Sequence, residues 1–216
     1  MSVASHTTIE ELRSICTDAP MQILFRSLLC CTYDDFCEIC DDAVGWASQE
    51  ISRNPQLKQG RSEDELTLDI VGYLRAMGFS ASHDTMTGGH SDILIEKDKK
   101  FLWWGEAKIH RDYDWLLSGY DQLSTRYMTG ALDQNRGALI IYNYGSRSDS
   151  VIGSWREYLE YNVDGITINS CPKDNNSFIS SHIHSGTGVE VKIRHSIVSL
   201  YRAPAPKRKG KKPPKK

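Results

Sequence analysis

The sequence lacks any hydrophobic run long enough to span a lipid bilayer, which would take about 20 predominantly apolar residues. Its first residues, MSVASHTTIEELR, also lack the basic stretch followed by an apolar stretch that marks a secretory signal. We therefore expect a cytoplasmic protein with no membrane contact. With 216 residues, the chain is long enough for one domain with a real hydrophobic core, or for one domain with an appendage.

The six cysteines lack the two separated pairs that a closed four-ligand zinc site requires. Cys37 and Cys40 form a C-x-x-C pair with Cys30 and Cys31 nearby, so a metal or iron–sulfur site is an alternative. However, the segment YDDFCEICDDAVGWASQEI is typical of a helix that has Cys37, Cys40 and Val44 on its packed side. Free cysteine in such a place behaves as a small apolar residue. We therefore predict structural thiols in a reducing compartment.

Two segments between Gly89 and Lys108, GHSDILIE and FLWWGEAK, alternate in the manner of β-strands. The polar segment Lys97–Lys100 separates them and is typical of a turn. The two segments are therefore predicted to form an antiparallel hairpin.

The register of this hairpin decides whether its acidic side chains meet. If Glu96 pairs with Leu102 across a three-residue loop, Asp92 lies opposite Glu106. Lys108 shares that surface because side chains two apart on a strand point the same way. A slip of one residue would send the two acids to opposite faces. The sequence allows the productive register.

Asp92, Glu106 and Lys108 form the minimum set for metal-dependent cleavage of a phosphodiester. Two close carboxylates repel each other unless a cation lies between them, and hard oxygen ligands suit Mg²⁺, with Mn²⁺ as a substitute. The metal would polarise a phosphoryl oxygen, and Lys108 would orient the attacking water or stabilise the developing charge. The alternative is that the Glu106 and Lys108 side chains are only the solvated face of an edge strand.

The order SDILIE, GEAK, a helix and then RGALIIYNYG resembles the restriction-endonuclease-like superfamily of PD-(D/E)xK nucleases, over roughly residues 61 to 145. Within it, the chain is most similar to small bacterial nucleases that are often linked to phage defence. Ser91 stands where the motif name has proline, and His90 where many relatives carry arginine. The resemblance implies an α/β fold with an αβββαβ core, a mixed central sheet flanked by helices. It also implies Asp92 and Glu106 as metal ligands and Lys108 as the catalytic lysine.

The segment SEDELTLDIVGYLRAMGF predicts a helix before the hairpin. Ser62 is its expected N-cap, and Glu65 three residues later completes a capping box. Glu63 extends the apolar stripe of this helix, so it should point at the sheet. In the superfamily a glutamate of this helix often approaches the metal, and the resemblance makes Glu63 the candidate. Stabilisation of the helix dipole is the alternative role.

After the lysine strand, Asp112 or Asp114 can cap a helix that is expected to end at Gly130. Gln122 and Arg126 stand one turn apart beside its inward side. The resemblance implies that Gln122 helps to place the lysine, the nucleophile or a phosphate, and that Arg126 contacts a phosphate; the alternative is an ordinary exposed pair. The stripe itself consists of Leu116, Tyr120, Leu123 and Tyr127, and the apolar run of residues 137–144 then predicts a buried strand.

The remaining segments complete the predicted organisation. Residues 1–60 are expected to be a helical appendage that forms a homodimer, contacts a defence-system partner protein or covers the core, and residues 61–203 the nuclease domain. Within that domain we expect a helix over residues 151–161 and a hairpin of residues 178–184 and 189–201. His182 and His184 are expected at the surface of that hairpin.

A basic tail closes the chain at residues 204–216, with seven Lys or Arg and no acid from Lys207 onwards. Such a composition predicts disorder and non-specific attraction to nucleic-acid phosphates. A tail that serves only solubility is the alternative. The candidate contacts are Lys207, Arg208, Lys209, Lys211 and Lys212.

We therefore predict a magnesium-dependent endodeoxyribonuclease that acts on DNA, with a role in bacterial anti-phage defence. An endoribonuclease or a junction or repair nuclease would use the same site, and RNA is not excluded. A non-catalytic module that binds nucleic acid or a partner is the alternative from another class. The sequence contains no recognition helix, zinc finger or base-reading loop, so it predicts no sequence specificity.

Overall fold

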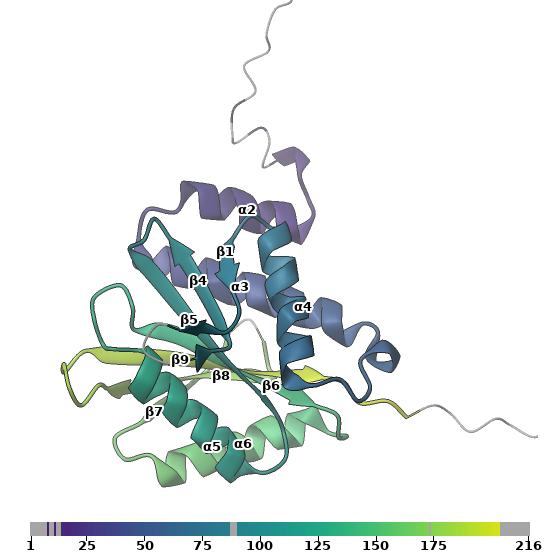
Figure 1. Cartoon of the computed structure of the whole chain (residues 1–216), viewed down its shortest axis with the longest axis vertical. Helices are drawn as coiled ribbons and strands as arrows, with labels where there is room; N and C mark the ends of the chain where they lie inside the picture. Colours follow the sequence, from purple (N-terminus) through teal and green to yellow (C-terminus); the bar gives the residue numbers. More distant parts are fainter. Residues whose placement is uncertain (1–7, 9–10, 12–13, 87–89, 173, 204–216) are drawn as a thin grey trace, which may run out of the picture.

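The computed structural model describes residues 8, 11, 14–86, 90–172 and 174–203. Its centre is a mixed seven-stranded sheet in the order β1-β4-β5-β6-β9-β8-β7. Five α-helices of the described residues flank this sheet (Figure 1). The predicted α/β class, with a mixed sheet flanked by helices, is confirmed. No helix in the described ranges is long and apolar enough to cross a membrane.

The helices are α2 (Ala19–Leu29), α3 (Tyr33–Ser52), α4 (Glu63–Ala76), α5 (Tyr113–Gln122) and α6 (Ser148–Asn162), with a 3₁₀ turn η1 (Pro55–Leu57) and a π-helical turn η2 (Leu123–Tyr127). The strands of the large sheet are β1 (Ser80–Ser82), β4 (Ile93–Lys97), β5 (Phe101–Ile109), β6 (Arg136–Asn143), β7 (Thr167–Ser170), β8 (Ser177–Ile183) and β9 (Glu190–Ser199). Two short strands, β2 (Thr85–Met86) and β3 (His90–Ser91), pair apart from it.

The sheet separates two hydrophobic layers. Helices α2, α3 and α4 cover one face, and α5 and α6 cover the other (Figure 1). Strand alternation divides the hairpin between them: Ile93 and Trp103 pack with α3 and α4, whereas Leu94 and Trp104 pack with α5. The sheet is therefore buried on both faces, as its continuous apolar strands require.

The predicted hairpin register is confirmed. Strands β4 and β5 are antiparallel, and Glu96 pairs with Leu102 across the three-residue loop 98–100. The ladder ends where Ile93 pairs with Gly105, so Asp92 stands just beyond it. The alternation therefore carries the predicted acids to one end of the hairpin.

Three parallel strands form the middle of the sheet, because β6 pairs in parallel with both β5 and β9. The carboxyl ends of these strands lie at the same end of the sheet, where Leu200 N donates to Asn143 O at 2.8 Å. The Gln59 amide donates to Leu200 O at 2.8 Å. The segment before α4 and the end of β9 therefore meet at the end of the sheet where β5 also ends.

Helix α3 belongs to the core that α4 and the sheet share. Cys37, Cys40 and Val44 are buried in it, as predicted, and every cysteine of the described residues is a free thiol. Of the three roles open for residues 1–60, covering the core is therefore one that α2 and α3 fulfil. A domain boundary at residue 60 stays a prediction.

Some predicted boundaries need correction. The helix after β5 does not continue to Gly130, because α5 ends at Gln122 and the π-helical turn ends at Tyr127. Helix α6 is longer than the predicted residues 151–161, and strand β7 was not predicted.

The predicted hairpin of β8 and β9 is confirmed, but His182 and His184 are both partly buried, so neither is simply a surface residue. His182 is half-buried, and its Nδ1 lies 2.9 Å from the hydroxyl of Tyr120. Packing of α5 against the hairpin therefore accounts for this histidine.

Candidate active site

Glu106 and Lys108 project from β5 towards α5, and both are almost fully buried, with exposed fractions of 2% and 5%. Asp92 lies beyond the end of the β4–β5 ladder on the same surface. Its Oδ2 accepts a hydrogen bond from Ala107 N at 2.8 Å. The predicted trio is thus brought to one place, with Asp92 clamped to the backbone of the strand that carries the other two.

Lys108 makes the polar contacts at the centre of the trio. Its ammonium donates a short hydrogen bond to Glu106 Oε1. The same nitrogen lies 3.6 Å from Oε1 of Glu63, which comes from α4. Carboxylates from β5 and from α4 therefore meet at this one ammonium group.

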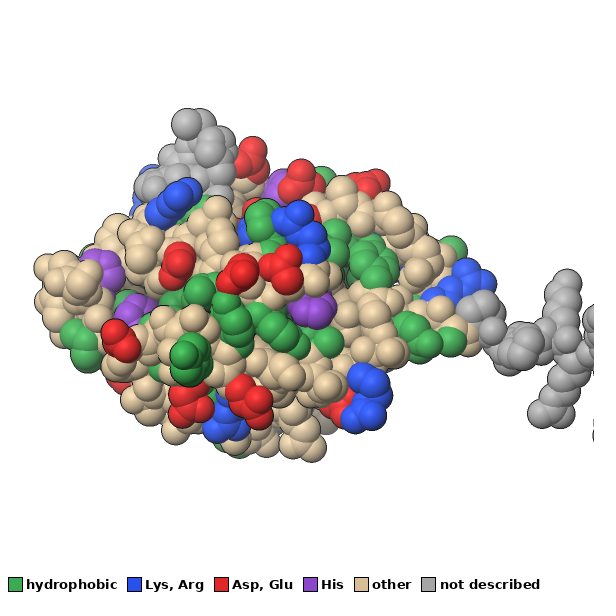
Figure 2. Space-filling model, turned by 90° about the horizontal axis from the view of Figure 1, so that it is seen from below, with side chains coloured by type: hydrophobic (Ala, Val, Ile, Leu, Met, Phe, Trp, Pro, Cys, Tyr) green, Lys and Arg blue, Asp and Glu red, His purple; other side chains and the backbone are tan. Residues whose placement is uncertain are grey.

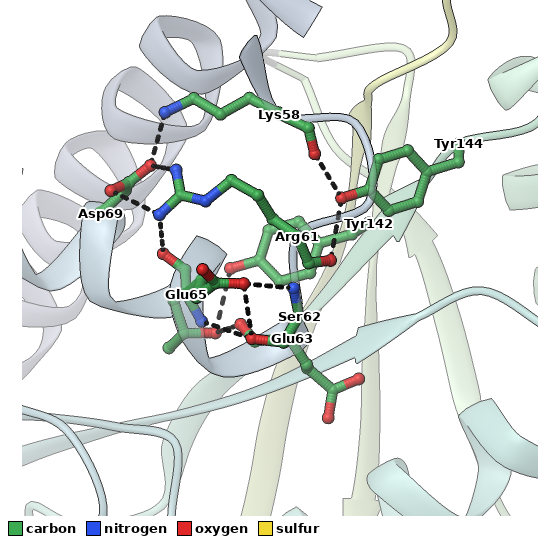
Figure 3. Close-up of polar contacts among 9 residues, drawn as sticks. Lys58, Arg61, Ser62, Glu63, Glu65, Asp69, Tyr142 and Tyr144 are labelled. Carbon is green, nitrogen blue, oxygen red and sulfur yellow. Dashed lines mark hydrogen bonds and ion pairs between the residues drawn. The ribbon is translucent and has the colours of Figure 1, made fainter. Parts of the chain in front are cut away.

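Glu63 reaches the sheet because the start of α4 is held firmly. Figure 3 shows the capping box, in which Glu65 N donates to Ser62 Oγ at 3.2 Å and Ser62 N donates to Glu65 Oε2 at 2.8 Å. The Glu63 side chain points away from this cap (Figure 3), and its Oε2 accepts from Ile109 N at 2.6 Å. The predicted direction of Glu63 is confirmed, and its role at a metal stays a prediction.

A second set of contacts ties the segment before α4 to the sheet (Figure 3). Lys58 and Arg61 both form ion pairs with Asp69 on α4. The Tyr144 hydroxyl donates to Lys58 O at 2.8 Å. These contacts fix the position from which Glu63 extends.

The carboxyl groups of the site are short of positive charge. Burial raises the pKa of Glu106 to about 7, and the charge of Asp92 adds to the rise. Burial also raises the pKa of Asp92 and of Glu63. Burial alone would lower the pKa of Lys108, but the neighbouring carboxylates, Glu106 foremost, outweigh it and raise that pKa. The positive charge of Lys108 is therefore shared by the carboxylates of Glu106, Asp92 and Glu63.

The donor set fits a divalent cation in its chemistry. Oε2 of Glu106 is buried and has no hydrogen-bond partner among the described residues. A buried polar atom in that state costs about 1–3 kcal/mol, and a bound cation would remove this cost. Carboxylate oxygens are also the ligands that Mg²⁺ and Mn²⁺ prefer. Across the described ranges, however, no three His, Cys, Asp or Glu side chains are already gathered as ligands.

Helix α5 packs directly on the stem of Lys108. A Cβ atom added at Gly119 would lie only 2.9 Å from Cγ of Lys108. The ammonium also lies 5.2 Å from the ring centroid of Trp115, in the first turn of the same helix. Gly119 and the Trp115 indole therefore restrict the position of the Lys108 side chain, in addition to the carboxylates.

The structure does not join Gln122 and Arg126 to the trio. Both line a shallow hollow on the outer side of α5 and η2, together with Asp121. No hydrogen bond or ion pair in the described part of the chain links either of them to Lys108. The basic-tail candidates Lys207–Lys212 lie outside the described residues.

Sequence reasoning missed Trp115 and Gly119, which pack against Lys108, and Arg111, which stacks on Trp115. The arginine and the tryptophan are four residues apart, directly after the lysine strand, and Arg111 Cζ lies 3.6 Å above the Trp115 ring centroid. A cation and an aromatic residue at that spacing next to a candidate catalytic lysine were a usable signal. Gly119 gave none, because its importance comes from packing.

Comparisons of the chain with protein-family models, with curated proteins and with solved structures find no match. Membership of a nuclease superfamily thus remains an inference from the motif and from the order of elements.

Proposed function

We propose that this protein is a metal-dependent nuclease whose active site consists of Asp92, Glu106 and Lys108. The observation that carries the proposal is the buried Glu106 carboxylate, which has an oxygen without a partner, lies near a second acid and contacts a buried lysine. A merely solvated strand face would not bury these groups, because charged side chains are rarely buried without a role or a partner.

The order of elements supports a restriction-endonuclease-like core. If the separate β2–β3 pair is left out, helix α4, strands β1, β4 and β5, helix α5 and strand β6 have the order αβββαβ. The acids lie at the end of the β4–β5 hairpin, and β6 continues the sheet in parallel. This is the arrangement that the resemblance implies.

The residues divide the chemistry among themselves. Asp92 and Glu106 would hold Mg²⁺ or Mn²⁺, with Glu63 as a further ligand, either directly or through water. A bound cation polarises the phosphate and lowers the pKa of a bound water. Lys108 is held close to the acids by Gly119 and Trp115, and its ammonium donates to the attacking water or to the charge that develops on the phosphate.

We propose DNA as the substrate and a role in bacterial anti-phage defence inside the cytoplasm, following the resemblance. An endoribonuclease would use the same acids and lysine, so it is the second candidate. A homodimer or a partner protein bound through residues 1–60 belongs to the same proposal.

The decisive test is cleavage of plasmid DNA and of RNA by the purified protein in Mg²⁺, Mn²⁺ or EDTA. We expect cleavage only with a metal. Asp92→Ala or Glu106→Ala should abolish it, and Lys108→Ala should lower it at least ~100-fold, the scale of losing one charge-stabilising group. Glu63→Gln should raise the Mg²⁺ concentration required by ~10–100-fold if Glu63 supports the metal.

Glu96→Ala is the matched control, because this acid lies on the same side of the hairpin but away from the trio. It should cleave as the wild type does. Undiminished cleavage by Asp92→Ala, free of contaminating nuclease, would contradict the proposal.

A further inference from the structure

Arg111 and Trp115 form a stacked pair beside the candidate active site. Arg111 follows β5, and Trp115 lies in the first turn of α5. The guanidinium carbon lies 3.6 Å from the indole centroid, and the Lys108 ammonium lies 5.2 Å from the same centroid. One indole therefore links an exposed cation to the buried lysine of the site.

The indole is held in place by the start of its helix. Asp112 is the N-cap of α5, and its Oδ1 accepts from Trp115 N at 2.7 Å. Trp115 is half-buried, whereas Arg111 is exposed. A guanidinium stacked on a ring keeps its N–H groups free at its edge, so the pair presents donors to solvent in a restricted orientation.

The charge of Arg111 is not neutralised within the described part of the chain. No ion pair joins it to an acidic side chain there. By contrast, Arg53 is paired with Glu50 at 2.8 Å, and Arg147 with Asp149 at 2.8 Å. Arg111 therefore keeps its full capacity for an external anion.

The surroundings make such a cation necessary for a polyanionic ligand. Asp92, Glu106 and Glu63 make the site acidic. Figure 2 shows the molecule from the side of α5 and α6, where acidic and basic side chains are scattered and form no continuous basic band. Attraction of a nucleic-acid strand to this region therefore depends on local cations close to the site.

We propose that Arg111, oriented by Trp115, binds a phosphate of the nucleic-acid strand next to the one that is cleaved. This inference rests on the proposed nuclease function and adds a binding residue to it. The planar guanidinium can donate two parallel hydrogen bonds to one phosphate, which fixes the strand in position as well as attracting it.

The test measures binding of a DNA oligonucleotide and of its RNA counterpart to the full-length chain over a salt series. Every protein carries Asp92→Ala, so that the strand is not cut. Arg111→Gln should weaken binding and reduce the slope of log affinity against log salt by about 0.7 to 0.9, the effect of losing one phosphate contact. Trp115→Leu keeps the cation, so it should weaken binding with little change in slope.

Arg53→Gln is the control for the loss of an exposed positive charge, since Arg53 lies at the end of α3 and not between β5 and α5, where Arg111 lies. It should leave the slope unchanged. Normal binding with the same slope for Arg111→Gln and Arg53→Gln would overturn this inference and leave the nuclease proposal standing. If the parent protein binds neither DNA nor RNA at any salt concentration, both proposals fail.

Discussion

His195 is a fully buried histidine whose two ring nitrogens are both used. The Trp155 indole donates to its Nδ1 at 3.1 Å, so its Nε2 carries the proton and donates to Ser180 Oγ at 2.8 Å. The Phe178 ring stacks on the imidazole with centroids 4.3 Å apart. This network holds α6 to the β8–β9 hairpin with the imidazole in its neutral form.

The stability of the fold should depend on pH through this residue. Burial lowers the pKa of His195 to about 3, so between pH 6.5 and about 3 the unfolded chain binds a proton that the folded chain does not. Stability is then lost as the pH falls through that window, by up to about 1.4 kcal/mol per pH unit. Buried carboxyls such as Glu106, with a raised pKa, act in the opposite direction.

The contribution of His195 is therefore measured as the difference in unfolding free energy between the wild type and a variant without this histidine. Urea unfolding of the wild type and of His195→Gln from pH 7 to pH 4 should show the advantage of the wild type shrinking as the pH falls. A constant difference across this range would mean that the histidine takes up its proton within the fold.

Single residues of the site were predictable where local rules place them. Asp92, Glu106 and Lys108 follow from strand alternation and a three-residue loop, and the direction of Glu63 follows from a capping box and an apolar stripe. His195 was not predictable, because its burial depends on Trp155 and Ser180, which tertiary packing brings together. Gly119 was missed for the same reason, because only tertiary packing brings it against Lys108.

Helix α5 packs against Lys108, the candidate catalytic lysine, and comes closest to it at Gly119. Alanine in place of glycine inside a helix usually adds up to about 1 kcal/mol of stability. Here the added methyl group would meet Lys108 Cγ at 2.9 Å and Leu139 Cδ1 at 3.3 Å. Gly119→Ala should therefore displace Lys108 and lower cleavage more than it lowers stability.

Gly72→Ala in α4 provides the comparison, because nothing lies within 4 Å of the added methyl group. It should raise the melting temperature and leave cleavage unchanged. Thermal melts and cleavage rates of both variants decide the matter: equal activity of the two variants would show that α5 does not position the lysine.

The start of a helix was predictable where a side chain caps it. Ser62 and Asp112 cap their helices with side chains that accept backbone N–H groups. Ser62 was the expected cap of its helix, and Asp112 was one of two candidates, with Asp114. Helix α6 begins after Arg147 in a left-handed conformation without a side-chain cap, so its start carried no such signal. Strand β7 is short and mostly exposed, and it lacks the apolar alternation that marks a strand.

At the scale of the whole molecule, α2 and α3 complete one of the two hydrophobic layers. Removal of residues 1–60 would expose apolar sheet residues such as Trp103 and Ile140, which pack in the same cluster as Phe36. Exposed apolar surface of this kind destabilises a fold and promotes aggregation. We expect the chain of residues 61–216 to lose cooperative unfolding, whereas deletion of residues 1–17 should leave it intact.

Circular dichroism melts and size-exclusion chromatography of the two truncated chains provide the measurement. A monomeric 61–216 chain with the melting temperature of the full protein would show that these residues fold on their own, as the predicted boundary at residue 60 implies.

Leu200, which follows β9, is hydrogen-bonded to Gln59 and Asn143 at one end of the sheet. These contacts fix the place where the chain leaves the sheet. Strand β5 ends at the same end of the sheet, one residue after Lys108. Leu200 therefore lies at the same end of the sheet as Lys108. Thirteen residues follow residue 203, and any thirteen residues can reach at most about 45 Å. A basic segment anchored there would act at a high effective concentration on whatever strand enters the site, so its position in the chain would matter as much as its charge.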